Sequence, residues 1–179
     1  MESLGFIVTE YTGVGEVAVV EDLDALFRAH YGRLVRALTL VAGSQEAAAD
    51  AVQEAFVKAH LHWRRVQRYD DPVGWVRRVA INKLRDESRR QGRKNKAVER
   101  MGSELRDDTV EWSDGSDAAA LLAGLPRQQR LAMALFYVEG LSVAEVASAL
   151  EISEGAVRFH LHQGRGKLRG LVDDHRETA

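Results

Sequence analysis

The sequence has no cysteine, only two prolines, and no apolar run long enough to span a membrane. Without cysteine, neither a disulfide framework nor a thiolate metal site can form, which fits a protein of a reducing compartment. The first residues, MESLGFIVTEY, contain no basic segment, so we expect no secretory signal peptide. Helix-forming residues dominate the 179-residue chain, and this composition predicts an all-α protein of one or two domains.

The net charge of −2 conceals an uneven distribution of charge along the chain. Residues 1–63 and residues 97–124 each carry a net charge of −5, and residues 125–179 are neutral. Residues 64–96 hold 12 basic and 4 acidic side chains, a net charge of +8. A basic block in an otherwise acidic chain indicates a localised contact with a polyanion.

The segment Leu141–Arg169 has the pattern of a helix-turn-helix, a motif that places its second helix in the DNA major groove. Ser142 and Glu145 form a capping-box sequence at the start of the first helix. A short turn at Glu151 follows, and Ser153 is placed to cap the second helix. A basic stripe alone would be typical of a solvated face, but the two caps and the short turn favour DNA binding.

The second helix of this motif has an apolar face and a polar stripe beside it. The predicted buried positions are Val157, Leu161, Gly164 and Leu168. The polar stripe takes the same steps one residue later, at Arg158, His162, Arg165 and Arg169. Side chains three or four residues apart share one face of a helix, so this stripe can meet phosphates and base edges together.

Two amphipathic helices are predicted near the N-terminus. The first covers residues 22–41 and is ended by Gly43, and Ser44 caps a second helix that runs to about Trp63. The outer face of the second helix shows Asp50, Gln53, Glu54 and Lys58.

A third helix is predicted from about Val73 to Arg90, with Pro72 in its first turn. Cations and one amide follow its outer edge at Arg78, Asn82, Arg85, Arg89 and Arg93, and Arg77 and Lys83 flank that edge. Tyr69 and Trp75 stand at its start. Basic side chains beside aromatic rings suit single-stranded nucleic acid, because cations follow the backbone and rings stack on bases. The alternative is that Trp75 and Tyr69 belong to the core.

Together the two halves resemble an extracytoplasmic-function (ECF) sigma factor, a small two-domain subunit of bacterial transcription initiation. DLDALFRAHYGRLVRAL, DAVQEAFVKAH and DPVGWVRRVAINKLRDESRR are similar to sigma region two. LPRQQRLAMALFYVEGLSVAEVASALEISEGAVRFHLHQGRGKLR is similar to sigma region four. The expected organisation is therefore a flexible extension (1–21), region two (22–94), a flexible linker (95–116), region four (117–172) and a tail (173–179).

The resemblance implies three contact surfaces. Core polymerase would bind at Asp50, Gln53, Glu54 and Lys58. The minus-10 element, read and opened as a single strand, would meet Tyr69, Trp75, Arg78, Asn82, Arg85 and Arg89. Duplex DNA at minus-35 would meet Arg158, His162, Arg165 and Arg169.

Core RNA polymerase and promoter DNA are thus the expected partners, with an anti-sigma factor as a further candidate and no membrane contact. The expected location is the cytoplasm, associated with the nucleoid. We expect no enzymatic activity and no cofactor.

The sequence departs from the family pattern in the helix-turn-helix. Phe159 and His160 stand where the family usually has a small residue and an arginine, and Gln163-Gly164 replaces a common Arg-Ala pair. Glu151 stands where the turn usually has glycine. A left-handed conformation costs a residue with a side chain about 1 kcal/mol, so a wider turn is predicted here.

The sequence leaves two other classes of function to compare with this resemblance. A metalloenzyme is disfavoured because His60 and His62, like His160 and His162, are two residues apart and fall on different faces of a helix. A stand-alone regulator with a C-terminal helix-turn-helix and an N-terminal sensor or dimerisation domain is the serious alternative. The basic block at residues 64–96 argues against it, because a sensor domain has no need of such a block.

Overall fold

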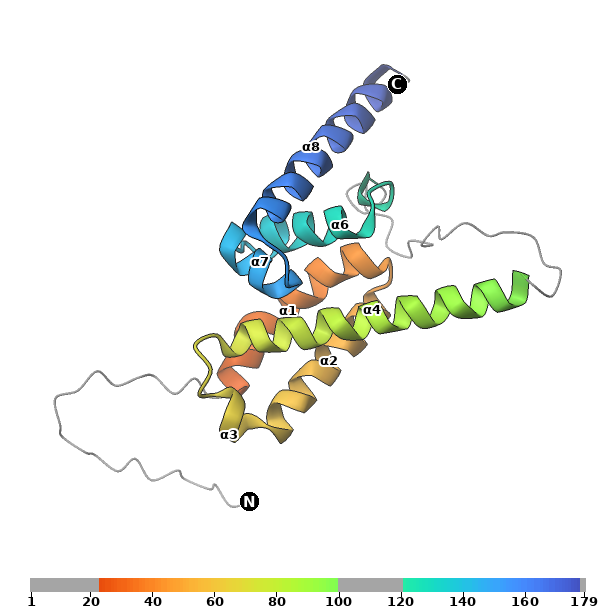
Figure 1. Ribbon diagram of the computed structural model, residues 1–179. Coiled ribbons are helices and arrows are strands. Elements are labelled where there is room, and N and C mark those ends of the chain that lie inside the picture. Colours follow the sequence, from red (N-terminus) through yellow and green to blue (C-terminus); the bar gives the residue numbers. More distant parts are fainter. Residues whose placement is uncertain (1–22, 100–120, 178–179) are drawn as a thin grey trace, which may run out of the picture.

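The computed structural model describes residues 23–99 and 121–177, and every regular element in these ranges is a helix (Figure 1). The all-α prediction is confirmed. The N-terminal half contains α1 (Leu23–Ala42), α2 (Gln45–Leu61), α3 (Trp63–Val66) and α4 (Pro72–Glu99). The C-terminal half contains α6 (Arg127–Met133), a π-helical segment η1 (Ala134–Val138), α7 (Val143–Leu150) and α8 (Glu154–Glu177). The expected N-terminal extension and most of the expected linker lie outside the described residues.

The corner between α1 and α2 forms as its local sequence predicts. Gly43 adopts a left-handed φ of 73°, which ends α1 at little steric cost. The hydroxyl of Ser44 then accepts a hydrogen bond of 3.2 Å from the backbone N–H of Ala47 and caps α2. The second helix ends at Leu61 rather than near Trp63, and that tryptophan opens the short α3.

Small side chains let the helices of the N-terminal half approach closely. The buried face of α2 carries alanine at 48, 51, 55 and 59, each without solvent exposure. Larger residues of α1 and α4, such as Leu34, Leu38 and Ile81, fill the space above them. At one end an aromatic cluster forms, in which Phe27 stacks on Tyr31 at 4.6 Å and meets Phe56 edge-on at 5.0 Å.

The fourth helix continues to Glu99, well past the end predicted near Arg90. Its distal part has no apolar period, but it is rich in Arg, Lys, Gln and Glu, which are good helix formers. Ion pairs one turn apart accompany it, as between Lys83 and Glu87 at 3.3 Å. Residues 95–99, predicted to begin a linker, therefore continue the helix.

The two halves pack against each other. In Figure 1, α7 lies over α4, and α6 with η1 lies over α1. Buried residues of both halves belong to one hydrophobic cluster, from Leu26 on α1 to Leu161 on α8. By contrast, α8 leads away from the body of the molecule, so one face of that helix is left open.

Candidate nucleic-acid interface

The predicted basic edge of α4 lies on one continuous helix, which now includes Arg93. Asn82, Arg89 and Arg93 are exposed, whereas Arg78 and Arg85 are half-buried. One guanidinium nitrogen of Arg85 donates to Asn82 Oδ1, and the other to the carbonyl of Leu150 on α7, each at 3.4 Å. Part of this edge is therefore covered by the C-terminal half.

Arg77 does not flank the basic edge as predicted, because it is buried between the two halves. Its side chain is 3% exposed and that of Glu139 is 2% exposed. The guanidinium donates from Nε to both carboxylate oxygens at 3.0 Å and from Nη2 to Oε1 at 2.9 Å. Such a two-pronged, charge-assisted pair is strong and directional. No local pattern in the sequence indicates this pair, since 62 residues separate the partners.

The start of α4 is built around Asp71. Its carboxylate accepts a 2.7 Å hydrogen bond from the backbone N–H of Gly74, and it lies 3.9 Å from Arg77 Nη1. A Cβ at Gly74 would collide with this carboxylate, so the exposed Asp71 side chain would have to move to admit a larger residue there. Trp75 is half-buried against the core, which supports the core interpretation of its ring. Tyr69 is half-buried too, with the Arg65 guanidinium 5.9 Å from its ring centre.

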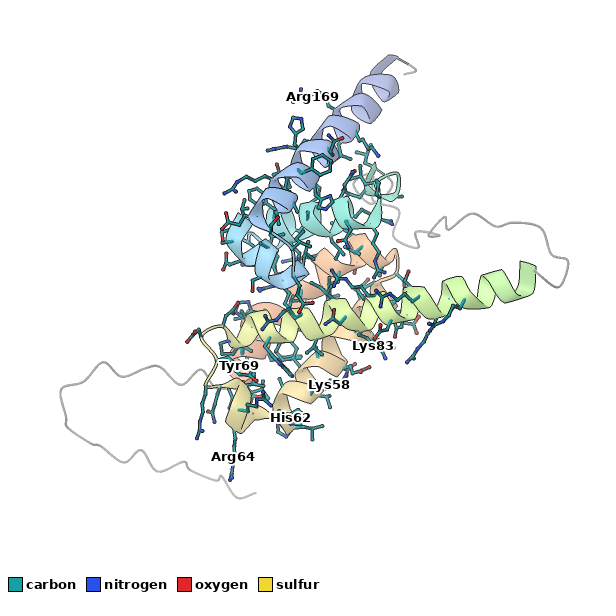
Figure 2. All side chains as sticks on the ribbon, in the orientation of Figure 1. Lys58, His62, Arg64, Tyr69, Lys83 and Arg169 are labelled. Carbon is teal, nitrogen blue, oxygen red and sulfur yellow. The ribbon has the colours of Figure 1, made fainter. Side chains whose placement is uncertain are left out.

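The outer face of α2 is exposed at Asp50, Gln53 and Lys58. Glu54 lies between two lysines: its oxygens are 2.8 Å from Lys58 Nζ and 2.6 Å from Lys83 Nζ on α4. Figure 2 shows Lys58 and Lys83 near each other. These hydrogen bonds, that of Lys58 first, lower the pKa of Glu54 to about 2.

The same face of α2 also includes apolar groups that were not predicted from the sequence. Val57 and Leu61 are more than half exposed, and they are spaced by one helical turn. Their signal in the sequence was present but weak, because single exposed apolar residues are common on protein surfaces.

The helix-turn-helix forms with the predicted caps. Ser142 Oγ accepts from the Glu145 N–H at 3.2 Å, and the Glu145 carboxylate accepts from the Ser142 N–H at 2.8 Å, which completes the capping box. Ser153 Oγ accepts from the Ala156 N–H at 3.1 Å and caps α8. The wider turn predicted at Glu151 was wrong. This residue takes the left-handed conformation, with φ 58° and ψ 43°, and the turn stays tight.

The faces of α8 are those predicted from the spacing. Val157, Leu161 and Gly164 are buried, and Leu168 is half-buried. All four residues of the polar stripe, Arg158, His162, Arg165 and Arg169, are exposed. Figure 2 shows Arg169 far along α8 from the N-terminal half.

One member of the polar stripe already has a partner on its own helix. Arg158 Nη2 lies 2.8 Å from a carboxylate oxygen of Glu154, one turn earlier. Both side chains are well exposed, so this pair is weak and its guanidinium can exchange to another acceptor.

Arginines of both halves influence one another where α6 begins. Burial lowers the pKa of Arg127, and the charges of Arg85, Arg130 and Arg89 lower it further. Burial also lowers the pKa of Arg130, whose Nε is buried without a hydrogen-bond partner. This gathering of like charge disfavours close packing of the halves, so it opposes the Arg77–Glu139 pair.

Among residues 23–93 and 121–170, whose side chains the structure describes, no three His, Asp or Glu side chains come together as a metal site would require. In the same ranges no helix is both long and apolar enough to cross a membrane.

Comparison with known proteins agrees with this arrangement. Residues 26–94 match the model of Sigma-70 region 2, and residues 117–168 match that of Sigma-70 region 4. The ECF RNA polymerase sigma factor SigE of Mycolicibacterium smegmatis is 33% identical, over 94% of this chain and 69% of its own length. SigM of Mycobacterium tuberculosis, also an ECF RNA polymerase sigma factor, is 31% identical, over 83% of this chain and 76% of its own.

Two solved structures share the fold. The sigma factor RpoE of Bartonella quintana, in complex with the anti-sigma factor NepR, superposes with a TM-score of 0.71 at 18% identity, over 86% of this chain and 98% of that one. CnrH, in complex with the cytosolic domain of CnrY, superposes with a TM-score of 0.59 at 26% identity, over 85% of this chain and 88% of that one. The matched regions and the identity to curated relatives agree, and the chain belongs to the ECF RNA polymerase sigma factors.

Proposed function

We propose that this chain binds core RNA polymerase in the cytoplasm, at the nucleoid, and directs promoter recognition, DNA melting and transcription initiation. It acts by position, with no chemical step of its own: one half holds the polymerase and opens DNA, and the other reads duplex DNA. The observation that supports this most directly is that a single chain carries both α4, with its basic edge, and a capped helix-turn-helix at α7–α8. A stand-alone regulator would need only the second.

The outer face of α2 is the proposed surface for core polymerase. Asp50 and Gln53 are exposed, and Val57 and Leu61 place apolar area beside them. Apolar groups bordered by polar ones are typical of protein interfaces. Lys58 and Glu54 complete the surface, and the Lys83 contact holds the Glu54 carboxylate in place.

The edge of α4 is the proposed surface for the minus-10 element. Asn82 and Arg89 are exposed, and the half-buried Tyr69 lies near the start of the helix. Trp75, which packs against the core, would position this end of the helix. Arg85 is partly covered by α7, because it donates to the Leu150 carbonyl, and Arg78 is half-buried. Full engagement of Arg85 with DNA requires the two halves to separate, and core polymerase would hold them apart. An anti-sigma factor would oppose this separation of the two halves.

The exposed stripe of α8 is the proposed surface for minus-35 DNA. Arg158 is near the helix N-terminus, the part that usually enters the major groove, so it is assigned a base edge. Arg165 and Arg169 follow later and are assigned phosphates. His162 lies between them and can serve either a base or a phosphate.

Run-off transcription with core polymerase tests the assignment. Asp50→Lys combined with Glu54→Lys should reduce co-purification with core. Asn82→Ala should leave core binding intact but reduce open complexes, as seen by permanganate reactivity. Arg158→Ala should lower transcription about tenfold, because one arginine–guanine contact discriminates by about 1–3 kcal/mol. A chain that binds its DNA site tightly without core, and gives no core-dependent initiation, would be a stand-alone regulator.

A further inference from the structure

Phe159 is a large apolar side chain in an unusual place. It lies in the second turn of α8, and 58% of its surface is exposed. Val157 and Leu161, two residues on either side, are buried. Since successive residues of an α-helix are about 100° apart, Phe159 points away from the buried face by about 160–200°. Its ring is therefore not part of the core of the C-terminal half.

The same outward face carries glycines that the packing does not require. Gly155 and Gly166 lie within about 40° of Phe159 around the helix axis. A Cβ at Gly166 would meet no atom within 4 Å, and one at Gly155 would meet only Ser153 Oγ at 3.9 Å. Glycine weakens a helix relative to alanine, but it lets another molecule approach the backbone closely. Phe159 thus stands between two positions where the helix is thin.

Positive charge borders this face on one side. Arg158 and Arg165 are exposed about 100° to 120° around the helix from Phe159. A helix with an apolar centre and cations on one side suits the major groove, where base edges lie between phosphate backbones, with Arg158 assigned to a base edge and Arg165 to a phosphate as above. The apolar group that the major groove presents is the C5 methyl of thymine, and phenylalanine is among the side chains that contact it.

We propose that Phe159 reads a thymine of the minus-35 element through its C5 methyl group. This inference rests on the proposed function, because it requires α8 to enter the major groove. Phe159 then determines specificity at one base pair, next to the pair assigned to Arg158. Within residues 154–170 of α8, whose side chains the structure describes, Phe159 is the exposed large apolar side chain.

Uracil substitution tests the contact at the level of a single methyl group. A promoter library transcribed by the wild-type holoenzyme first gives the preferred minus-35 sequence. Each thymine of that element is then replaced by deoxyuridine, which removes the methyl group and keeps the base pair. At one position this replacement should weaken promoter binding by the wild type about fourfold, because the burial of one methyl group is lost. Phe159→Ala should bind the thymine and uracil templates equally.

Tyr137→Ala is the matched control. Tyr137 is an aromatic side chain of the same half, 53% exposed, and it lies on η1 rather than α8. This variant should keep the full uracil effect, and thermal unfolding of both variants should match the wild type. A uracil effect that persists in Phe159→Ala, or no effect at any minus-35 position, overturns the proposal.

Two further results separate the remaining explanations. If Phe159→Ala weakens assembly with core and leaves the base profile unchanged, the ring contacts polymerase, and the DNA contact is wrong. If the wild type directs core to no promoter in the library, the proposed function itself fails, and the reading of thymine fails with it.

Discussion

Removal of the Arg77 guanidinium should loosen the packing of the two halves. In Arg77→Ala the Glu139 carboxylate, almost fully buried, would lose the donors of its hydrogen bonds from Nε and Nη2. Removing one partner of a buried ion pair costs about 3–5 kcal/mol, because the other charge is left without compensation. About 1.4 kcal/mol is a factor of ten in an equilibrium constant. The ratio of the closed arrangement, in which the two halves pack together, to open arrangements should therefore fall by about a hundredfold to several thousandfold.

Fluorescence energy transfer within the full chain measures this effect. The native sequence has no cysteine, so cysteines introduced at Arg64 on α3 and Lys167 on α8, both exposed, would be the only sites of labelling. Arg77→Ala should lower the transfer efficiency and broaden its distribution. Arg28→Ala breaks the exposed pair with Asp24 instead, and should change little.

The double substitution Arg77→Met with Glu139→Leu sharpens the test. It removes both charges and fills the site with apolar groups, so it should restore the closed arrangement. Equal transfer efficiency in Arg77→Ala, Arg28→Ala and the wild type would refute the reasoning, because the ion pair would then contribute nothing to the packing of the halves.

Three further predictions concern local energetics. Gly164→Ala should destabilise the fold by about 1 kcal/mol in urea unfolding, because its Cβ would lie 3.0 Å from Met133 Cγ. Gly166→Ala has open space around it and should stabilise the fold by about 0.5–1 kcal/mol. Stability changes of the same sign in the two variants would contradict this reasoning. Glu151→Gly should stabilise by about 1 kcal/mol in the same assay, since it relieves the left-handed strain, and a loss of stability would show that the strain is absent. Lys83→Met should raise the pKa of Glu54 from about 2 toward 4.5 in a carboxyl NMR titration. A carboxylate whose pKa is lowered in the folded state stabilises the fold at pH values above its unfolded pKa, and this stabilisation is lost as the pH falls through the folded pKa. The variant should therefore lose less stability than the wild type between pH 4.5 and about 2.

The features that could be predicted from the sequence are those set by neighbours in the chain. Ser44, Ser142 and Ser153 act within one helical turn, so their caps could be predicted from spacing alone. The exposed stripe and buried face of α8 likewise follow from a helical period. The prediction of a wider turn at Glu151 was wrong because it rested on a local steric cost of about 1 kcal/mol alone. The packing of α7 on α8 outweighs that cost.

The features that could not be predicted depend on groups distant in the chain. Arg77 belongs to the same run of basic residues as Arg78 and Arg85, and nothing local distinguishes it; only the packing of the halves places Glu139 beside it. Lys83 meets Glu54 for the same reason, since α4 passes α2. The contact roles of the three proposed surfaces come from the family resemblance, and they stay predictions.

The π-helical segment holds one residue more than an α-helical turn, so we expect the C-terminal half to tolerate the loss of one residue there. In Ala134–Val138 the backbone closes one residue later than in an α-helix, as when the Glu139 N–H donates to the Ala134 carbonyl at 3.2 Å. Deletion of one residue here would convert that turn to an ordinary α-helical turn and keep Glu139 directed at Arg77. The same deletion within α7 would rotate every later side chain of that helix by about 100°. We therefore expect that loss of the codon for the exposed Tyr137 would leave α7 and α8 aimed as they are.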